Sequence, residues 1–223
     1  MLVYLLERRA NLDAVVKIGG SFQDHRPALK RLCRILKEIS NQRSILVLPG
    51  GGRFANFVRH NQGPQRLSDR TSHMMAIFGM DIFGYKLHDL IEGSRLARSL
   101  KRVGSRRCSI FLPFKELRNC NELEPSWDVT SDSIAAWTAG EIGCKKLVLV
   151  KSVDGIFHRR KLLVSISARD LKKIKQTVVD LKLPQILEKH RITCWIVSGK
   201  YPERIEAAIE GKKAISTVIL PEV

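Results

Sequence analysis

Residues 14–21 of the chain read AVVKIGGS, and residues 44–53 read SILVLPGGGR. Each stretch is a short apolar run, Ala14 to Ile18 and Ser44 to Leu48, that ends in glycines. Such a run predicts a buried strand, and the glycines let the backbone approach a ligand closely before a helix begins. Because apolar residues at helical spacing lie between them, from Pro27 to Ile39, the two stretches predict one βαβ unit.

The same alternation of strand and helix continues to the end of the chain. It predicts an α/β domain with a mostly parallel sheet covered on both faces. Further helices are predicted at Phe54 to Arg59, Asp69 to Ile91, Ile134 to Ile142, Ala168 to Lys175, Pro184 to His190 and Pro202 to Glu210, and further strands at Ser109 to Leu112, Lys146 to Val150, Thr193 to Val197 and Ile215 to Leu220. The methionines of the Asp69 to Ile91 helix are interpreted as core or as a subunit contact.

Length and composition indicate an ordinary globular protein. The 223 residues are 44% hydrophobic and 27% charged, and no linker divides them, so we expect a single domain over residues 1–223. No apolar run reaches the roughly 18 residues of a membrane span, and Met1 to Leu6 is too short for a signal peptide. We therefore expect a cytoplasmic protein without a membrane partner.

The formal charge of +17 raises the question of nucleic-acid binding. Basic residues are spread through Arg26 to Arg43, Arg95 to Arg107 and Arg159 to Lys175, mixed with apolar residues at helical spacing. This distribution is typical of solvated helix faces, and no nucleic-acid motif or interleaved aromatic residue accompanies it. Nucleic acid is therefore not the expected partner, although the charge can steer small anionic substrates.

Cysteine and histidine spacing predicts no metal site. The five cysteines are odd in number and lack any Cys-x-x-Cys pair, so we expect reduced thiols, with Cys33, Cys144 and Cys194 as small hydrophobic residues. The six histidines also lack the spacing of metal ligands. No residue is therefore assigned to a metal.

The glycine-rich turns are candidate phosphate sites, because the first N–H groups of the following helix point back at the turn. With Lys17 as a charge at the end of the first strand, they favour phosphoryl transfer over nucleotide storage. The candidate phosphate-binding residues are Gly19, Gly20, Ser21, Gly50, Gly51 and Gly52. Arg53 has a planar fork suited to an anionic acceptor. The alternatives are tight helix packing for the glycines and an ordinary strand-end lysine for Lys17.

Three further residues have both a structural and a functional interpretation. Asp132 follows Thr130 and Ser131 before a helix, so it is either a cap residue or a carboxylate that orients Lys17 and helps place magnesium-bound phosphates. Asp154 either forms a turn with Gly155 or belongs to a nucleotide site. Lys151 ends a strand and either reaches the nucleotide phosphates or is solvated.

Four segments carry a resemblance to a known family: Lys17 to Ser21, Gly50 to Gly52, Thr130 to Ser133 and Val153 to Gly155. In order and spacing they are similar to the motifs of the amino acid kinase family, which includes acetylglutamate, uridylate and isopentenyl phosphate kinases. The resemblance covers almost the whole chain. It implies a three-layer αβα sandwich that forms a homo-oligomer, with ATP and Mg²⁺ at the carboxyl ends of the strands.

The resemblance also implies roles for the residues. Lys17 would stabilise the transition state, Asp132 would organise the cations, both glycine turns would bind phosphates, and Asp154 with Gly155 would bind the nucleotide. The acceptor would lie near the second glycine turn, in an acceptor-binding part of about residues 1–130, followed by a nucleotide-binding part of about residues 131–223.

One family feature is missing. Many members carry a Gly-Gly-Met-x-x-Lys segment that supplies a second catalytic lysine, whereas residues 176–184 of this chain read QTVVDLKLP. The second cation is therefore open between Lys151, Lys200, the cluster from Lys172 to Lys175, and a loop of a neighbouring subunit.

Within the family, the segments Trp127 to Trp137, Ser72 to Ala76 and Ser198 to Arg204 look most like an archaeal and methylotroph branch. That branch phosphorylates aminomethylfuranmethyl phosphate to the diphosphate during methanofuran synthesis. The resemblance implies an ATP-dependent kinase with a phosphate-bearing acceptor.

The candidate acceptor-binding residues are Arg53, Asp69, His73 and Thr130. The alternative enzymes are a uridylate kinase and an isopentenyl phosphate kinase. A nucleotide-binding regulatory or storage protein that has lost transfer is an alternative of another class, and a nucleic-acid binder is the third.

Overall fold

A single sheet of eight strands forms the centre of the molecule, whose computed structural model describes residues 12–103 and 107–222. The strand order is β3-β4-β2-β1-β5-β9-β10-β8. These strands are β1 (Ala14–Ile18), β2 (Ile45–Pro49), β3 (Arg95–Ala97), β4 (Cys108–Phe111), β5 (Lys146–Lys151), β8 (Ser165–Ser167), β9 (Thr193–Ser198) and β10 (Ser216–Leu220). All neighbours run parallel except β9 and β10, so the expectation of a mostly parallel sheet is confirmed.

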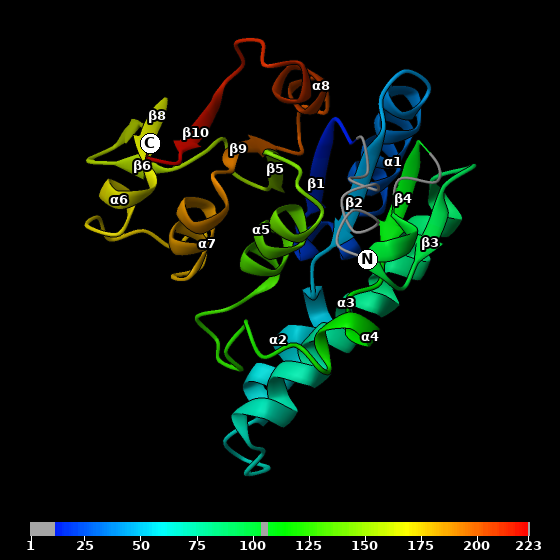
Figure 1. Cartoon of the computed structure of the whole chain (residues 1–223), viewed down its shortest axis with the longest axis vertical. Coiled ribbons are helices and arrows are strands. Elements are labelled where there is room, and N and C mark those ends of the chain that lie inside the picture. The colour runs from blue at the N-terminus through cyan, green and yellow to red at the C-terminus, as the bar shows by residue number, and fades with distance from the viewer. Residues whose placement is uncertain (1–11, 104–106, 223) are drawn as a thin grey trace, which may run out of the picture.

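Helices cover both faces of the sheet, with α1 and α8 on one side and α5 and α7 on the other (Figure 1). The helices are α1 (Arg26–Ser40), α2 (Gly52–Asn61), α3 (Asp69–Leu90), α4 (Phe114–Leu117), α5 (Ser131–Glu141), α6 (Ala168–Leu171), α7 (Leu183–His190) and α8 (Glu203–Glu210). Among the described residues, no helix combines the length and apolarity needed to cross a membrane.

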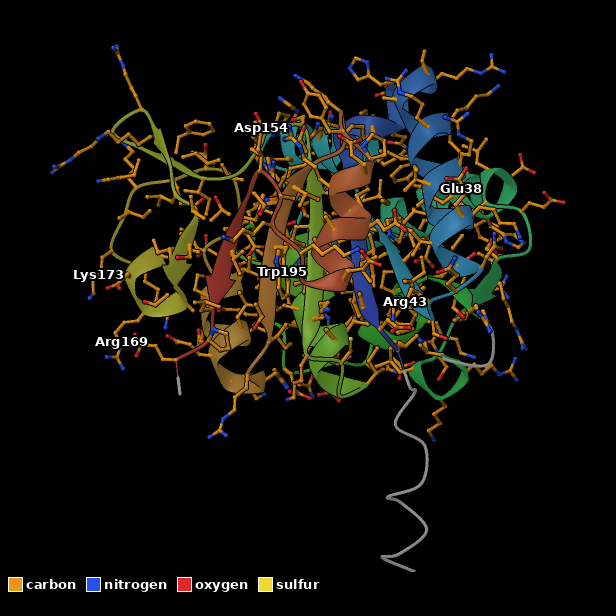
Figure 2. The ribbon with its side chains drawn as sticks, turned by 90° about the horizontal axis from the view of Figure 1, so that it is seen from above. Glu38, Arg43, Asp154, Arg169, Lys173 and Trp195 are labelled. Carbon is orange, nitrogen blue, oxygen red and sulfur yellow. The ribbon has the colours of Figure 1, made fainter. Side chains whose placement is uncertain are left out.

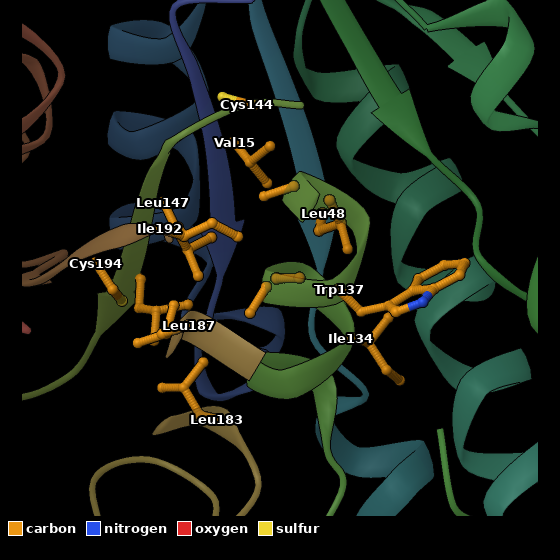
Figure 3. Close-up of a cluster of buried hydrophobic side chains, with 14 of the residues drawn as sticks. Val15, Leu48, Ile134, Trp137, Cys144, Leu147, Leu183, Leu187, Ile192 and Cys194 are labelled. Atoms are coloured by element: carbon orange, nitrogen blue, oxygen red, sulfur yellow. The ribbon is translucent and has the colours of Figure 1, made fainter. Parts of the chain in front are cut away.

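Alternation along the strands decides which side chains face which layer. On β1, Val15 packs toward α5 and α7 (Figure 3). Val16 packs toward α1 on the opposite face. On β5, Leu149 belongs to the same side as Val15. Lys17 and Lys151 lie two residues beyond Val15 and Leu149, so both lysines point toward the layer of α5 at the carboxyl ends of adjacent strands.

Two of the three basic segments differ from the expected solvated helix faces. Arg95–Ala97 is the edge strand β3, and a short 3-10 helix at Leu100–Arg102 follows it. Arg159 and Arg160, with φ of 48° and 65°, form the turn of a hairpin between β6 (Phe157–His158) and β7 (Lys161–Leu162). Segments of two or three residues are too short to show a helical or strand pattern of apolar residues. Their structure is set instead by backbone pairing with neighbouring strands. Residues 104–106 of the basic run, like Met1 to Leu6, lie outside the described residues.

Smaller differences concern the third quarter of the chain and the methionines. The helix expected at Ala168 to Lys175 ends at Leu171, and α4, β3 and β6–β8 were not predicted. Met80 is buried in the core, whereas Met75 is exposed. Cys33, Cys144 and Cys194 are buried free thiols, which confirms their role as small hydrophobic residues.

Candidate active site

A buried carboxylate joins the two strand-end lysines. Lys17 Nζ donates a hydrogen bond to Asp132 Oδ1 at 2.8 Å, and Lys151 Nζ donates to Asp132 Oδ2 at 2.5 Å. Lys17 and Asp132 are 4% and 3% exposed. Because β1 and β5 are adjacent and α5 begins above their ends, three segments far apart in sequence meet at one point. The arrangement fixes two ammonium groups on opposite oxygens of one anion.

The electrostatics of this group keep the carboxylate ionised. Burial acts to raise the pKa of Asp132, but the charges of Lys151 and Lys17 and their hydrogen bonds outweigh it and lower the pKa to about 2. Burial also lowers the pKa of Lys17, and the neighbouring Lys151 acts in the same direction, while Asp132 opposes both. Asp132 is therefore the partner that keeps a buried ammonium charged.

A second acid, Asp180, was missed by the sequence analysis. Its Oδ2 accepts hydrogen bonds from the Thr130 amide (2.9 Å), the Thr130 hydroxyl (2.8 Å) and the Ser133 amide (3.0 Å). Its Oδ1 accepts from the Ser133 hydroxyl (2.5 Å) and the Leu183 amide (2.9 Å). One carboxylate therefore caps both α5 and α7 and fixes the turn that carries Asp132.

The pKa of Asp180 is raised by burial and by the charge of Asp132, while its bonds to Ser133 and Thr130 oppose the rise. A usable signal existed in the sequence: an aspartate three residues before the first residue of a helix that has proline at its start.

The glycine turns only partly match the prediction that all of them donate to phosphates. The Gly19 amide donates to the Val150 carbonyl at 2.9 Å, and the Gly50 amide donates to the Ile18 carbonyl at 2.9 Å. These two amides continue the hydrogen-bond ladders of the sheet and already have backbone partners. The remaining candidate amides have no partner among the described residues: Gly20, Ser21, Gly51 and Gly52.

The two turns touch each other directly. A Cβ atom on Gly20 would lie 2.2 Å from the Gly52 nitrogen, so only glycine fits there. Gly52 has a φ of 54°, and the buried Gln23 side chain beside it accepts a hydrogen bond from the Arg53 amide at 3.1 Å. Gln23 therefore connects the first turn to the start of α2, a role that no feature of the sequence indicates.

A cavity of about 550 Å³ opens beside these turns. Its polar side is lined by Gly20, Ser21, Gly51, Gly52, Arg53 and Lys151, and its apolar side by Ala76, Ile77, Met80, Trp127, Val129 and Ile134. His73 and Thr130, both expected near an acceptor, also line it. Burial lowers the pKa of His73, so its imidazole is neutral near pH 7.

Other predicted residues lie outside this cavity. Asp69 is exposed at the start of α3, where its Oδ1 accepts a hydrogen bond from Gln62 at 2.6 Å. Asp154 lies at the edge of the sheet where β5 ends (Figure 2), and Arg204 donates to its Oδ1 at 2.5 Å. Gly155 packs against Thr217, as a tight turn requires. Asp154 and Gly155 therefore lie in the bend that follows β5, with the Asp154 carboxylate paired to Arg204.

The arrangement has a clear chemical capacity. The ammonium of Lys151, four free amides and the guanidinium of Arg53, which is paired with Asp24, line one end of the cavity, and the buried ammonium of Lys17 shares Asp132 with Lys151. Such donors stabilise negative charge on phosphoryl oxygens, and because they are fixed beforehand, they need little rearrangement during a reaction.

Comparison with known proteins gives consistent results. Residues 14–100 and 109–198 match the model of the amino acid kinase family. The chain is 36% identical to [5-(aminomethyl)furan-3-yl]methyl phosphate kinase of Methanocaldococcus jannaschii over 213 residues, which cover 92% of this chain and 97% of that protein.

Two solved structures have the same fold. Uridylate kinase from Archaeoglobus fulgidus superposes with a TM-score of 0.74 at 19% identity, covering 92% of this chain and 99% of that one. UMP kinase from Bacillus anthracis superposes with a TM-score of 0.75 at 15% identity, covering 94% and 96%. These matches confirm the predicted three-layer αβα sandwich.

Proposed function

The chain belongs to the amino acid kinase family, and on that premise we propose that it transfers the γ-phosphoryl group of ATP to [5-(aminomethyl)furan-3-yl]methyl phosphate, forming the diphosphate. The observation that carries the proposal is the Lys17–Asp132–Lys151 group beside a cavity with free amides and arginines. The extent of the match to the archaeal kinase, nearly end to end in both chains, supports the choice of acceptor.

In this proposal, Lys17 and Lys151 neutralise the charge that spreads over the transferred group. Asp132 aims both lysines, and the amides of the two turns hold the phosphates in line. We assign the second cation left open by the sequence to Lys151, because it shares Asp132 with Lys17, whereas Lys172 and Lys173 are paired with Glu188 and Asp170. No covalent intermediate with the enzyme is required.

The site fits ATP with Mg²⁺ held mainly by the nucleotide. Both Asp132 oxygens already accept lysine hydrogen bonds, and no cluster of three or more His, Cys, Asp or Glu side chains suited to a metal occurs in residues 12–103 and 107–222. We therefore assign Mg²⁺ to the phosphates, where it would offset their charge. Asp154 and Gly155 remain our candidates for the nucleotide-binding part, about residues 131–223. We propose a cytoplasmic location, where ATP is available as the donor.

We also propose that the chain forms a homodimer through the apolar groove between α2 and α3. Phe57, Met75, Phe78 and Ile82 are large, exposed side chains that line this groove. The last three lie at positions i, i+3 and i+7 of one long helix, so the helix of a second copy can cover them while its own stripe is covered in return.

The proposal is tested with purified protein, magnesium, labelled ATP and four acceptors: the aminomethylfuran phosphate, UMP, isopentenyl phosphate and acetylglutamate. We expect ADP release and a diphosphate of the furan acceptor by mass, and Lys17→Ala should abolish both. Lys173→Ala, which changes a surface lysine, is the matched control. Equal rates with and without every acceptor, or turnover of acetylglutamate alone, would contradict the proposed reaction.

A further inference from the structure

The indole ring of Trp127 lines one wall of the cavity, and a hydrogen bond at its edge fixes its orientation. We propose that the indole face of Trp127 is the binding surface for the aromatic ring of the acceptor, with Gln62 and Asp69 as positioning residues that hold the indole in place. This inference rests on the proposed function, because a furan ring is the part of that acceptor that requires a flat apolar partner.

The edge of the indole is held by a chain of hydrogen bonds. Trp127 Nε1 donates to Gln62 Oε1 at 2.5 Å, and Gln62 Nε2 donates to Asp69 Oδ1 at 2.6 Å. These contacts engage the single polar atom of the side chain, while Trp127 stays half-buried and lines the cavity. Asp69 lies outside the cavity, but these hydrogen bonds connect it through Gln62 to Trp127 in the cavity wall.

The surroundings of Trp127 suit an uncharged ring. Ile77, Met80, Val129 and Ile134 line the same side of the cavity, and the amides and lysine lie on the other side. A phosphate ester bound with its phosphate at the amides would therefore place its organic part against the apolar wall. Stacking on an indole adds a geometric preference for flat rings that aliphatic side chains do not provide.

Arg59 shows that the indole face attracts a flat partner. Its guanidinium lies 4.4 Å from the centre of the indole ring, and the part of the chain that the structure describes gives it no ion pair. A planar cation held only by stacking can be exchanged for a planar ring. In our proposal the acceptor ring takes this place, and the guanidinium moves onto the anionic end of the acceptor.

Steady-state kinetics separate the role of Trp127 in binding from a structural role. Trp127→Ala should raise the KM for the furan acceptor about tenfold or more, with the KM for ATP unchanged. Trp127→Phe keeps a ring and should retain most of the affinity, while Asp69→Ala should give an intermediate rise. Trp195→Phe, a change on β9 outside the cavity (Figure 2), is the matched control. Equal KM increases for the furan acceptor and for isopentenyl phosphate, or no increase, would overturn the proposal.

A binding measurement without ATP keeps this test independent of turnover. Titration with the furan phosphate should change the indole fluorescence of the wild type and of Trp195→Phe, but not of Trp127→Phe. If no acceptor is turned over while this pattern holds, the transfer proposal fails and the ring site stands. A fluorescence change that persists in Trp127→Phe would refute the ring site alone.

Discussion

Replacing Asp132 by asparagine tests the central group most directly. The amide can accept a hydrogen bond from one lysine only, and its NH2 group would face the ammonium of the other. Removal of one preorganised charge-stabilising group costs about 10²–10³ in kcat in well-studied enzymes. Because Asp132 holds both lysines, we expect Asp132→Asn to lower kcat by at least about 10²-fold.

The structure also gives a stability estimate for the same change. The pKa of Asp132 falls from 3.8 to about 2, a difference that corresponds to roughly 2 kcal/mol of folding free energy at neutral pH. The sign follows from the lowered pKa: this stabilisation is complete above about pH 4 and is lost as the pH falls toward 2. Near pH 7, Asp132→Asn should therefore unfold at a lower urea concentration than the wild type. This difference in stability should disappear as the pH falls toward 2.

The assay pairs initial rates at saturating ATP and acceptor with urea unfolding at several pH values. Asp128→Asn, which changes an exposed aspartate just before α5, is the control and should match the wild type. A kcat within threefold of wild type in a folded Asp132→Asn protein would refute the reasoning, since the two lysines would then act without their shared anion.

Three other outcomes are expected. Lys151→Met should lower kcat about 10²-fold while the melting temperature changes little, because this lysine is partly exposed, and steady-state rates with thermal melts measure both. Asp180→Ala should lower the unfolding free energy in urea by about 2–4 kcal/mol, because five donors at two helix ends lose their acceptor. Because burial lowers the pKa of Lys17, kcat/KM for ATP should decline at a pH below 10.5, where Lys17 loses its proton. Asp132→Asn removes the charge that opposes this shift and should move the decline to still lower pH.

Much of the fold followed from the sequence because its central strands are continuous apolar runs. The prediction for β1, Ala14 to Ile18, matched to the residue, since a strand buried on both faces shows its limits as a change from apolar residues to glycine. β3 and the β6–β7 hairpin could not be found in this way. Their few residues are held by pairing with partners distant in the chain or by turn residues in strained conformations.

Within the candidate site, the sequence identified groups but not their connections. The sequence indicates that Lys17 and Lys151 each end a strand, yet only the tertiary structure shows that they share Asp132. Gln23 went unnoticed because it acts through the backbone amide of a remote segment, and amide positions leave no residue-specific mark in a sequence. The position of Asp180 before a helix with proline at its start indicates a cap of α7, but nothing in the sequence indicates its bonds to the start of α5.

The paired acids and lysines have a consequence for the behaviour of the protein in salt. Lys17 and Lys151 both bond to Asp132, and the charge of the Asp180 carboxylate also acts on Lys17, so these four groups are formally electroneutral despite the chain's charge of +17. The exposed cations that line the cavity are Arg53, which pairs with Asp24, and Arg59. Added salt should therefore weaken the binding of anionic ligands but have little effect on phosphoryl transfer, so that KM rises with ionic strength and kcat stays constant.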